Sequence, residues 1–497
     1  MGNIKDLRDW LTEVENMGEL IRISEEVDWD QEMSAITYMA SQEPEAPAIL
    51  FEKIKGSPEG YRALFNVLTS LNKMALNLRL PPGRSILEVI QLFREKMNKR
   101  IEPEIVDSKS APINENICMG DDIDLFKFPA PKMWPLDGGR YIGTGDIVIT
   151  QDPNAGWLNL GTYRQMVLSK NEVGFYVSPG HDALLHREGW WKQGKPCEVA
   201  AVYGVDPLLV TVGCLNYPKT LSEYEFAGGV QGRPVEVVKG EVTDLLIPAR
   251  AEIVIEGLAY PGNVKEEGPF GEFNGYYGRP AGPTPVIEVK CVHYRNNPIL
   301  TGVVMANYPA CEPGLFHAVA KSARVWDDLL AFGVPGIRGV FAPPGAANGC
   351  GMLVISLEQR YPGHASQVAA LAAQCMGSAY FTKWIIVVDE DVDPTEMNQV
   401  LWAMTTRCSP TDDIDILRNT WSTYLDPTKN PPEERPYSSK VLINACKEHK
   451  YLSVFARRTA ITREIYDQVS SRWKGLGLKG EPPQIRLFEE FEGDVER

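Results

Sequence analysis

The sequence predicts an α+β protein of several domains, in which a β-rich central region lies between two α/β regions. The chain has 497 residues, a length typical of two to four domains. Between about residues 114 and 300, short β-branched and apolar runs alternate with Gly and Pro, which is typical of a barrel or a sandwich. On both sides of this region, apolar residues recur at helical spacing between short strand-like runs.

The N-terminal region, residues 1–112, is predicted to be an α/β domain. Its first helix is indicated by apolar residues that share one face and precede a glycine, which favours helix termination. These residues are Leu7, Trp10, Leu11, Val14 and Met17, followed by Gly18. The pattern continues with strands over 20–23 and 48–51 and helices over 28–39 and 85–97.

The central region, residues 113–308, is predicted to consist mainly of strands. The β-rich runs cover 147–150, 199–203, 208–212, 235–238, 252–256 and 286–292. A helix over 182–191 is the main interruption. We therefore expect a β unit built from short strands that are joined by Gly- and Pro-rich turns.

The C-terminal region, residues 309–460, returns to an α/β pattern. The predicted elements are helices over 315–332 and 367–376 and strands over 352–357 and 384–388. The acidic run 389–393 is interpreted as solvated rather than as a cation site. In the final region, residues 461–497, Thr462 can cap a helix with Ile465, Val469 and Trp473 on one stripe. This stripe is a candidate contact with another subunit.

The composition argues against several classes of function. The formal net charge of −16 argues against a nucleic-acid partner, which requires a basic surface. The nine cysteines form no CxxC pair, which is typical of a reduced protein rather than a disulfide scaffold or zinc ribbon. The N-terminus has no apolar signal segment and no run approaches the length of a membrane span, so we expect a cytoplasmic protein with no membrane partner.

The segment 266–272, Glu-Glu-Gly-Pro-Phe-Gly-Glu, is the most informative motif. It places Glu267 and Glu272 in a Gly- and Pro-rich turn around one aromatic residue. Two carboxylates that lie close together push their pKa values apart, which suits them to proton transfer. The alternative is a surface turn with two solvated acids. A second polar segment, Asn-Leu-Gly-Thr-Tyr-Arg at 159–164, favours the first interpretation.

Asn159, His181 and Glu223 together offer an amide oxygen, an imidazole nitrogen and a carboxylate oxygen. This set suits Mn²⁺ or Mg²⁺, with open positions for a phosphate. The three residues are too far apart in sequence for a local metal motif, so an ordinary loop histidine is the alternative for His181. The sequence has no Rossmann, Walker or nucleophile-elbow motif.

Taken together, the motifs resemble the UbiD-type decarboxylases, which use prenylated FMN (prFMN), and in particular the branch that acts on aromatic acids. The resemblance covers nearly the whole chain and rests on 159–164, Pro179-Gly180-His181, Ser222-Glu223-Tyr224-Glu225, 267–272, and 387–394 with Leu401-Trp402-Ala403-Met404. It implies a central split β-barrel that binds the flavin, flanked by α/β N-terminal and C-terminal domains. The chain departs from some members at Leu160 and Gly180, and it lacks a flavin-contacting lysine near Gly377.

The family's pattern also assigns roles. Asn159, His181 and Glu223 would hold the divalent metal against the cofactor phosphate, and backbone carbonyls around 212–215 would bind K⁺. Arg164, Glu267 and Glu272 would form the catalytic network, in which Glu272 donates a proton and the other two orient the substrate. The implied cofactor-binding residues are Asn159, Gly161, Thr162, Tyr163, Arg164, Gly180, His181, Gly213, Cys214, Leu215 and Glu223.

The implied reaction is the reversible, non-oxidative decarboxylation of an aromatic or heteroaromatic acid, with CO₂ as a product. Amino-acid side chains cannot stabilise the electrons left on an sp² carbon, so the cofactor must accept them. A flavin prenyltransferase is the implied supplier of the cofactor, and a homodimer or homohexamer is expected. The candidate substrate-pocket residues, which are alternatively plain core residues, are Phe316, His317, Trp421 and Tyr424.

Two other functions are weighed against this one. An FMN-dependent oxidoreductase also suits a split barrel, but hydride transfer does not need the set of Arg164, Glu267 and Glu272. A non-catalytic homologue should have lost at least one of these residues, and all three are present. The decarboxylase is therefore favoured.

Overall fold

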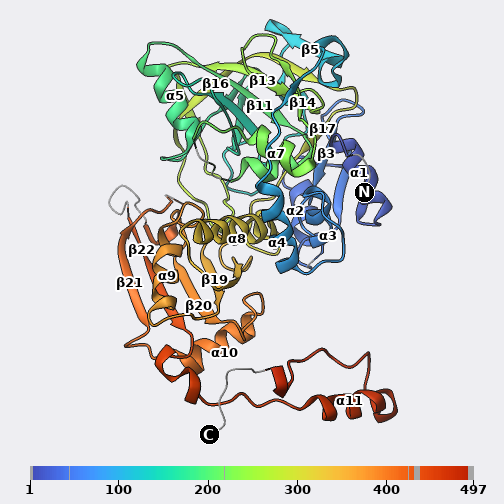
Figure 1. Cartoon of the computed structure of the whole chain (residues 1–497). Coiled ribbons are helices and arrows are strands. Elements are labelled where there is room, and N and C mark those ends of the chain that lie inside the picture. The colour runs from blue at the N-terminus through green and yellow to red at the C-terminus, as the bar shows by residue number, and fades with distance from the viewer. Residues whose placement is uncertain are drawn as a thin grey trace.

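The computed structural model describes residues 4–43, 45–215, 217, 219–423, 425–429 and 437–490. The fold is mixed α/β with several units, as predicted. A β-rich unit lies at the top of Figure 1, the N-terminal unit lies beside and below it, and a C-terminal α/β unit lies underneath. Helix α8 (Pro313–Ala331) runs between the upper and lower units.

The N-terminal unit packs helices on a small sheet. Its elements are α1 (Leu7–Asn16), β1 (Leu20–Val27), α2 (Glu32–Ala40), β2 (Ala48–Ile54), β3 (Arg62–Phe65), α3 (Leu71–Asn77) and α4 (Ile86–Met97). The predicted apolar face of α1 is buried, and Asp6 caps this helix. Strand β17 (Ile299–Thr301) pairs in parallel with β3, so a strand from far along the chain completes the sheet β1-β2-β3-β17.

The central unit is built on a ten-stranded, curled sheet in the order β6-β9-β10-β16-β14-β11-β7-β8, with β5 and β15 also paired to β16. Its strands are β5 (Asn116–Met119), β6 (Tyr141–Gly143), β7 (Asp146–Gln151), β8 (Leu158–Gly161), β9 (Gln165–Ser169), β10 (Glu172–Gly174), β11 (Cys197–Tyr203), β14 (Ile253–Ala259), β15 (Val264–Glu267) and β16 (Gly282–Tyr294). A smaller sheet joins β4 (Glu104–Ile105), β12 (Glu236–Lys239) and β13 (Leu246–Pro248). Ile147 and Ile149 pack into one core and Val148 into another, so the large sheet is buried on both faces.

The helices of the central unit are α5 (Asp182–Lys192), α6 (Pro207–Gly213) and α7 (Glu223–Gln231). The prediction of a strand over 208–212 is wrong, because these residues form most of α6. Asp206 caps α6 by accepting the amide hydrogen of Leu208 at 3.1 Å, and Pro207 occupies its first turn. The helix is buried on nearly all sides, so its residues lack the polar face that would have distinguished it from a buried strand.

The C-terminal unit is a five-stranded sheet in the order β18-β19-β20-β22-β21, covered by helices. Its elements are β18 (Ile337–Phe341), β19 (Met352–Leu357), α9 (His364–Gln374), β20 (Trp384–Asp389), α10 (Met397–Arg407), β21 (Ile414–Thr420) and β22 (Ser438–Ala445). Strands β19, β20 and β22 are parallel, and the two edge strands are antiparallel to their neighbours.

The prediction that the acidic run after β20 is solvated is wrong for two of its acids. Asp389 and Asp391 are 6% and 7% exposed. Arg407 contacts them at 2.8 and 2.6 Å, and Arg458 donates to the Asp391 carbonyl oxygen at 2.9 Å. These arginines come from later segments, so the local pattern gave no sign of the pairing.

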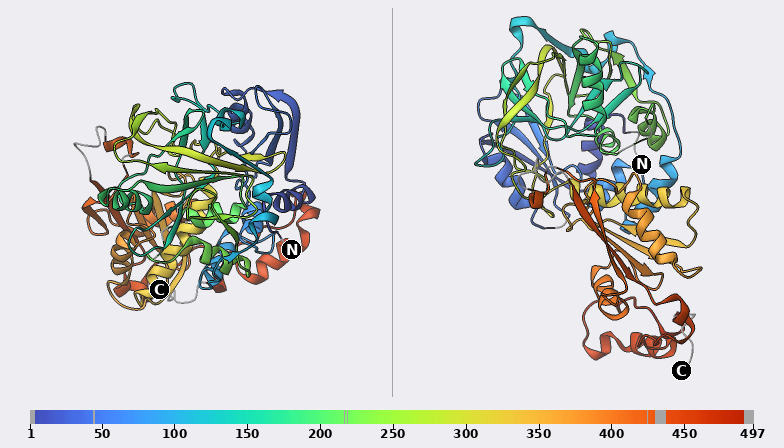
Figure 2. Two further views of the ribbon diagram at one scale, coloured as in Figure 1. Left: turned by 90° about the horizontal axis from the view of Figure 1, so that it is seen from above. Right: turned by 90° about the vertical axis from the view of Figure 1, so that its left-hand side faces the viewer.

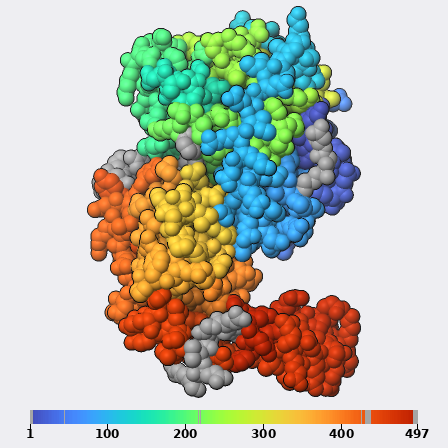
Figure 3. Space-filling model, viewed as in Figure 1, coloured from blue at the N-terminus to red at the C-terminus, as the bar shows by residue number. Residues whose placement is uncertain are grey.

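Arg458 lies at the start of a C-terminal arm, residues 459–490, that extends away from the body (Figures 2 and 3). Helix α11 (Arg463–Arg472) begins after Thr462, whose hydroxyl accepts the Ile465 amide hydrogen, as predicted. All residues of α11 are described and none is buried. Ile465 and Val469 are 44% and 37% exposed. No helix in the described ranges is long and apolar enough to span a membrane.

Candidate active site

The turn that follows β15 carries the two glutamates of the 266–272 motif. Glu267 ends β15, and the amide of Glu272 donates to the Tyr276 carbonyl at 2.9 Å on the return of the turn. Gly268 has a φ of +93°, which favours glycine. The alternative of two solvated acids is wrong, because Glu267 and Glu272 are only 1% and 6% exposed.

Arg164 bridges these glutamates from the connection between β8 and β9. Its Nη1 lies 2.8 Å from Glu272 Oε1, its Nε lies 3.1 Å from Glu267 Oε1, and its Nη2 lies 3.3 Å from Glu267 Oε2. The Arg164 side chain is 9% exposed. The structure therefore brings together the three residues predicted to be catalytic, in a cluster that is largely shielded from water.

Sequence analysis did not identify three further partners of Glu267. Tyr141 donates to Glu267 Oε1 at 3.0 Å, Arg279 Nη2 lies 2.8 Å from Oε2, and Thr284 contacts Oε2 at 3.4 Å. A basic residue within the same Gly- and Pro-rich segment was a usable signal for Arg279. Tyr141 comes from the distant strand β6 and gave no comparable signal.

The two glutamates have opposite electrostatic environments. Burial raises the pKa of Glu272 above its usual value, and the charge of Arg164 only partly offsets this. Burial acts on Glu267 in the same direction, but Arg164 and Arg279 outweigh it and lower the pKa of Glu267. The environment of Glu272 therefore favours the protonated carboxyl, and the environment of Glu267 favours the ionised carboxylate.

Asp137 fixes the loop that carries Glu272. Its Oδ1 accepts from the Gly271 amide at 2.9 Å, and its Oδ2 accepts from the Met133 and Trp134 amides at 3.2 and 3.0 Å. Burial raises the pKa of Asp137 to about 6 despite these hydrogen bonds. The side chain holds two backbone segments together next to the catalytic cluster.

The predicted metal ligands come from three elements of the central unit. Asn159 lies on β8, His181 directly precedes α5, and Glu223 is the first residue of α7. Glu223 Oε2 accepts the Leu160 amide hydrogen at 2.7 Å, which places this carboxylate beside the residue that follows Asn159. Tyr163 lies next to His181, with ring centroids 6.2 Å apart.

These three residues fit a divalent cation chemically. Burial lowers the pKa of His181, so a neutral imidazole is available as a ligand. Burial also raises the pKa of Glu223 to about 8. The Asn159 Nδ2 is buried without a hydrogen-bond partner. An amide with an unused N–H beside a buried carboxyl suits a cation together with a phosphate oxygen.

The predicted cofactor-binding residues between these clusters also lie close together. Thr162 Oγ1 lies 3.4 Å from Cys214 Sγ, and a Cβ on Gly213 would lie 3.3 Å from the Leu160 carbonyl oxygen. Residues 159–164 and the end of α6, which leads into Leu215, therefore run side by side. A Cβ on Gly161 would clash with the Tyr163 ring, so glycine is required there.

The C-terminal unit contributes aromatic residues to the same region. Gly180 has a φ of +94°, and a Cβ there would lie 2.9 Å from the Trp421 ring. Tyr380, which sequence analysis did not identify, links the units because its ring lies 5.6 Å from His181 and 4.9 Å from Trp421. The Leu425 carbonyl accepts from Asn274 at 2.6 Å, beside the Glu272 turn.

The other predicted pocket residues differ in their surroundings. Phe316 is 2% exposed and belongs to the main hydrophobic core. His317 is half-buried, and its Nδ1 lies 2.9 Å from the Asn348 carbonyl oxygen and 3.4 Å from Cys350 Sγ. Tyr424 lies outside the described residues.

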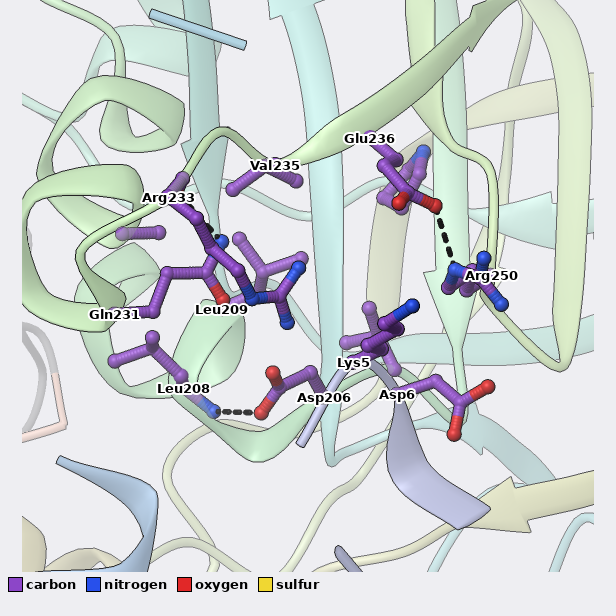
Figure 4. Close-up of a pocket in the computed structure, with 13 residues that line it drawn as sticks. Lys5, Asp6, Asp206, Leu208, Leu209, Gln231, Arg233, Val235, Glu236 and Arg250 are labelled. Atoms are coloured by element: carbon purple, nitrogen blue, oxygen red, sulfur yellow. Dashed lines mark hydrogen bonds and ion pairs between the residues drawn. The ribbon is translucent and has the colours of Figure 1, made fainter. Parts of the chain in front are cut away.

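A separate cavity of about 30 Å³ lies between the N-terminus, α6 and β12 (Figure 4). Several of its polar side chains are paired: Arg250 contacts Glu236 at 2.6 Å, Asp206 accepts from the Leu208 amide at 3.1 Å, and Asp6 contacts Arg295 at 3.0 Å. The cavity has room for about one water molecule. It contains none of the predicted site residues and joins the N-terminal segment to the central unit.

Comparison with protein families gives matches along most of the chain. The N-terminal, Rift-related and C-terminal domains of 3-octaprenyl-4-hydroxybenzoate carboxy-lyase match residues 11–93, 104–308 and 315–445. The three domain names are UbiD_N, UbiD and UbiD_C.

Solved structures of similar proteins agree with these matches. Vanillic acid decarboxylase of Sedimentibacter hydroxybenzoicus in its closed form is 32% identical, with a TM-score of 0.85 over 96% of this chain and 99% of that one. An evolved dimeric form of the UbiD-class enzyme HmfF from Pelotomaculum thermopropionicum, in complex with prFMN, is 29% identical, with a TM-score of 0.77 over 92% and 97%. Apo 3,4-dihydroxybenzoic acid decarboxylase (AroY) from Klebsiella pneumoniae is 29% identical, with a TM-score of 0.79 over 92% and 97%.

Proposed function

The chain belongs to the UbiD family of carboxy-lyases, and on this premise we propose that it catalyses the reversible, non-oxidative decarboxylation of an aromatic or heteroaromatic acid with prFMN. The observation that carries the proposal is the buried cluster of Arg164, Glu267 and Glu272. Vanillic and 3,4-dihydroxybenzoic acids are the first substrates to test, because similar proteins act on them.

The three residues have distinct tasks in this reaction. Arg164 binds the substrate carboxylate, since a guanidinium group matches a carboxylate in charge and geometry. Glu267 stays ionised and holds Arg164 in position at 3.1 and 3.3 Å. Burial raises the pKa of Glu272, which favours its protonated form, and Glu272 delivers this proton to the carbon that loses CO₂. When bound, prFMN supplies the electron acceptor that no side chain can provide.

The cofactor site we propose lies in the curled sheet, which would act as a split barrel. Asn159, His181 and Glu223 would hold Mn²⁺ or Mg²⁺ against the phosphate, and carbonyl groups around 212–215 would bind K⁺. The close approach of 159–164 to the end of α6 supports one continuous site. Trp421 and Tyr380 would form an aromatic wall suited to a flat ring.

We also propose that the protein self-associates through its C-terminal arm, as a homodimer or homohexamer. Helix α11 exposes Ile465 and Val469, and within the described ranges none of its residues belongs to a hydrophobic cluster, so its apolar stripe is available to a second copy. Arg458 and Asp391 attach the arm to the body at 3.3 Å. All nine cysteines are free, which suits the expected cytoplasmic location. The same cell must also contain a flavin prenyltransferase.

The decisive experiment is purification after co-expression with a flavin prenyltransferase. We expect mass spectrometry to find prFMN and a panel of aromatic acids to show CO₂ release, with Mn²⁺ or Mg²⁺ and K⁺ detected by elemental analysis. Unmodified FMN together with NAD(P)H oxidation would contradict the proposal and favour an FMN oxidoreductase. Bound prFMN without turnover of any acid would favour a non-catalytic homologue.

A further inference from the structure

Glu267 contacts two arginines, whereas Glu272 contacts one. Arg279 Nη2 lies 2.8 Å from Glu267 Oε2, and Arg164 contacts both oxygens of the same carboxylate at 3.1 and 3.3 Å. In the part of the chain that the structure describes, Glu272 forms its ion pair with Arg164 alone, at 2.8 Å. The two glutamates therefore differ in how much they depend on Arg164.

Arg279 is itself held in place. Its Nη2 also donates to Thr284 Oγ1 at 2.6 Å, and its guanidinium carbon lies 4.1 Å from the centroid of the Tyr176 ring. Arg164 lies 4.3 Å from the centroid of the same ring, so one aromatic ring contacts both cations. With Arg279, Tyr141 and Thr284 around it, Glu267 keeps three partners even when Arg164 turns elsewhere.

The charges of the cluster favour an incoming carboxylate. The two guanidinium groups contact two carboxyl groups, Glu267 and Glu272. When a substrate carboxylate takes the place of Glu272 on Arg164, each guanidinium group keeps a carboxylate partner, and the attraction is stronger than in water because the site is shielded. Without Arg279, Glu267 and the substrate compete for one guanidinium group.

We propose that Arg279 is a positioning residue that holds Glu267 as an anion, so that the substrate carboxylate displaces Glu272, and not Glu267, from Arg164. The inference rests on the decarboxylase function proposed above. Each residue then has its own role. Arg279 balances the negative charge of Glu267, and Arg164 is left to bind the substrate carboxylate. The displaced Glu272 is free to approach the reacting carbon with its proton.

The test compares Arg279→Gln and Arg279→Lys in the prFMN-loaded enzyme, with Arg250→Gln as the matched control. Arg250 pairs with Glu236 at 2.6 Å in the same unit, outside the proposed site. Binding of benzoate and of phenol separates recognition of the carboxylate from recognition of the ring. We expect Arg279→Gln to weaken benzoate binding by about tenfold and phenol binding by less than about twofold.

The pH profile gives a second readout. Removing the Arg279 charge raises the pKa of Glu267, so the acid limb of kcat/KM should move to higher pH in Arg279→Gln and return toward the wild-type position in Arg279→Lys. Arg250→Gln should change neither property. Equal losses of benzoate and phenol binding, or an acid limb that does not move, would overturn the proposal.

The two proposals can fail separately. If the wild-type enzyme releases CO₂ from none of the acids tested, the decarboxylase function is wrong. The ratio of benzoate to phenol binding in wild type and Arg279→Gln still decides whether Arg279 governs recognition of a carboxylate. Circular dichroism of each variant ensures that only folded protein is compared.

Discussion

The two ends of β16 border two buried carboxylate clusters with opposite properties. Near its first residue, Thr284 faces Glu267 of the catalytic cluster. Toward its last residue, Cys291 and His293 face Glu256 of β14. Both clusters border the same sheet and are shielded from water, but both oxygens of Glu256 have hydrogen-bonding partners, whereas the Glu272 side chain is bonded to Arg164 alone among the described residues.

The structural cluster is fully paired. Glu256 Oε1 accepts the Glu241 amide hydrogen at 2.7 Å and lies 2.7 Å from His293 Nε2. His293 Nδ1 lies 2.8 Å from Asn114 Oδ1. The Asn114 amide is oriented because its Nδ2 donates to the Ser108 carbonyl oxygen at 2.9 Å. Both ring nitrogens of His293 therefore have a hydrogen-bonding partner.

The difference shows how two buried carboxyl groups beside one sheet can differ. Burial would raise the pKa of Glu256, but hydrogen bonds from His293 and Thr243 outweigh it, and the pKa is lowered. Among the described residues, Glu272 has no comparable set of donors, and its pKa is raised. A buried carboxyl with few partners stabilises the fold less, but its raised pKa suits the proton transfer that we propose for Glu272.

The largest effect on activity is expected from a substitution of Glu272. Glu272→Gln removes the transferable proton while keeping the shape of the side chain, so the rate of CO₂ release should fall by about 10²–10⁴-fold. Thermal unfolding should show unchanged or slightly increased stability, because a buried ionisable group is lost. Turnover at the wild-type rate would contradict the assignment of Glu272 as the proton donor.

The matched change at Glu256 should lower stability and leave activity nearly unchanged. Glu256→Gln removes the buried carboxylate that is hydrogen-bonded to His293, Thr243 and the Glu241 amide, and breaking such a buried charged network costs about 3–5 kcal/mol. The midpoint of urea unfolding should fall, whereas kcat of the folded enzyme should stay near that of wild type. A variant that keeps its stability but loses activity would show that the two clusters are not separate.

The stability changes caused by Glu272→Gln and Glu256→Gln should have opposite signs, and both should depend on pH. Glu272 has a raised pKa, so its contribution to stability falls as pH rises above about 4.3, and the advantage of Glu272→Gln over wild type should grow toward pH 7. Glu256 has a lowered pKa, so the loss in Glu256→Gln should be complete at pH 7 and shrink below about pH 4. Unfolding free energies measured from pH 3 to 8 test both trends, and parallel curves would refute them.

The smallest loss of stability is expected from Cys291→Ala. Cys291 Sγ lies 3.3 Å from His293 Nε2, and losing this weak contact and one buried sulfur should cost about 1 kcal/mol. The ligand atoms of Glu256, Cys291 and His293 lie within 4.8 Å of one another, a spacing that also suits a metal. The 2.7 Å approach of Glu256 to His293 is a hydrogen bond, however, so neither EDTA nor Zn²⁺ should change the melting temperature.

Elements with a local signal were predictable from the sequence. The apolar face of α1 and the Thr462 cap of α11 follow from residues within one or two helical turns, and both predictions are confirmed. The run 208–212 failed because a helix buried on nearly all sides has no polar face. Arg279 lies in the same Gly- and Pro-rich segment as Glu267, but the sequence did not show that the turn brings its Nη2 to 2.8 Å from Glu267 Oε2.

Amino-acid order alone was sufficient to place two glutamates in one Gly- and Pro-rich turn and to select residue types suited to decarboxylation. It did not reveal that two arginines would lower the pKa of Glu267 while burial raises that of Glu272, or that Asp389 and Asp391 would be buried in ion pairs. Those properties arise from burial and from charges that distant segments bring within about 3 Å, and electrostatic energy at such distances depends on folding, not on separation along the chain.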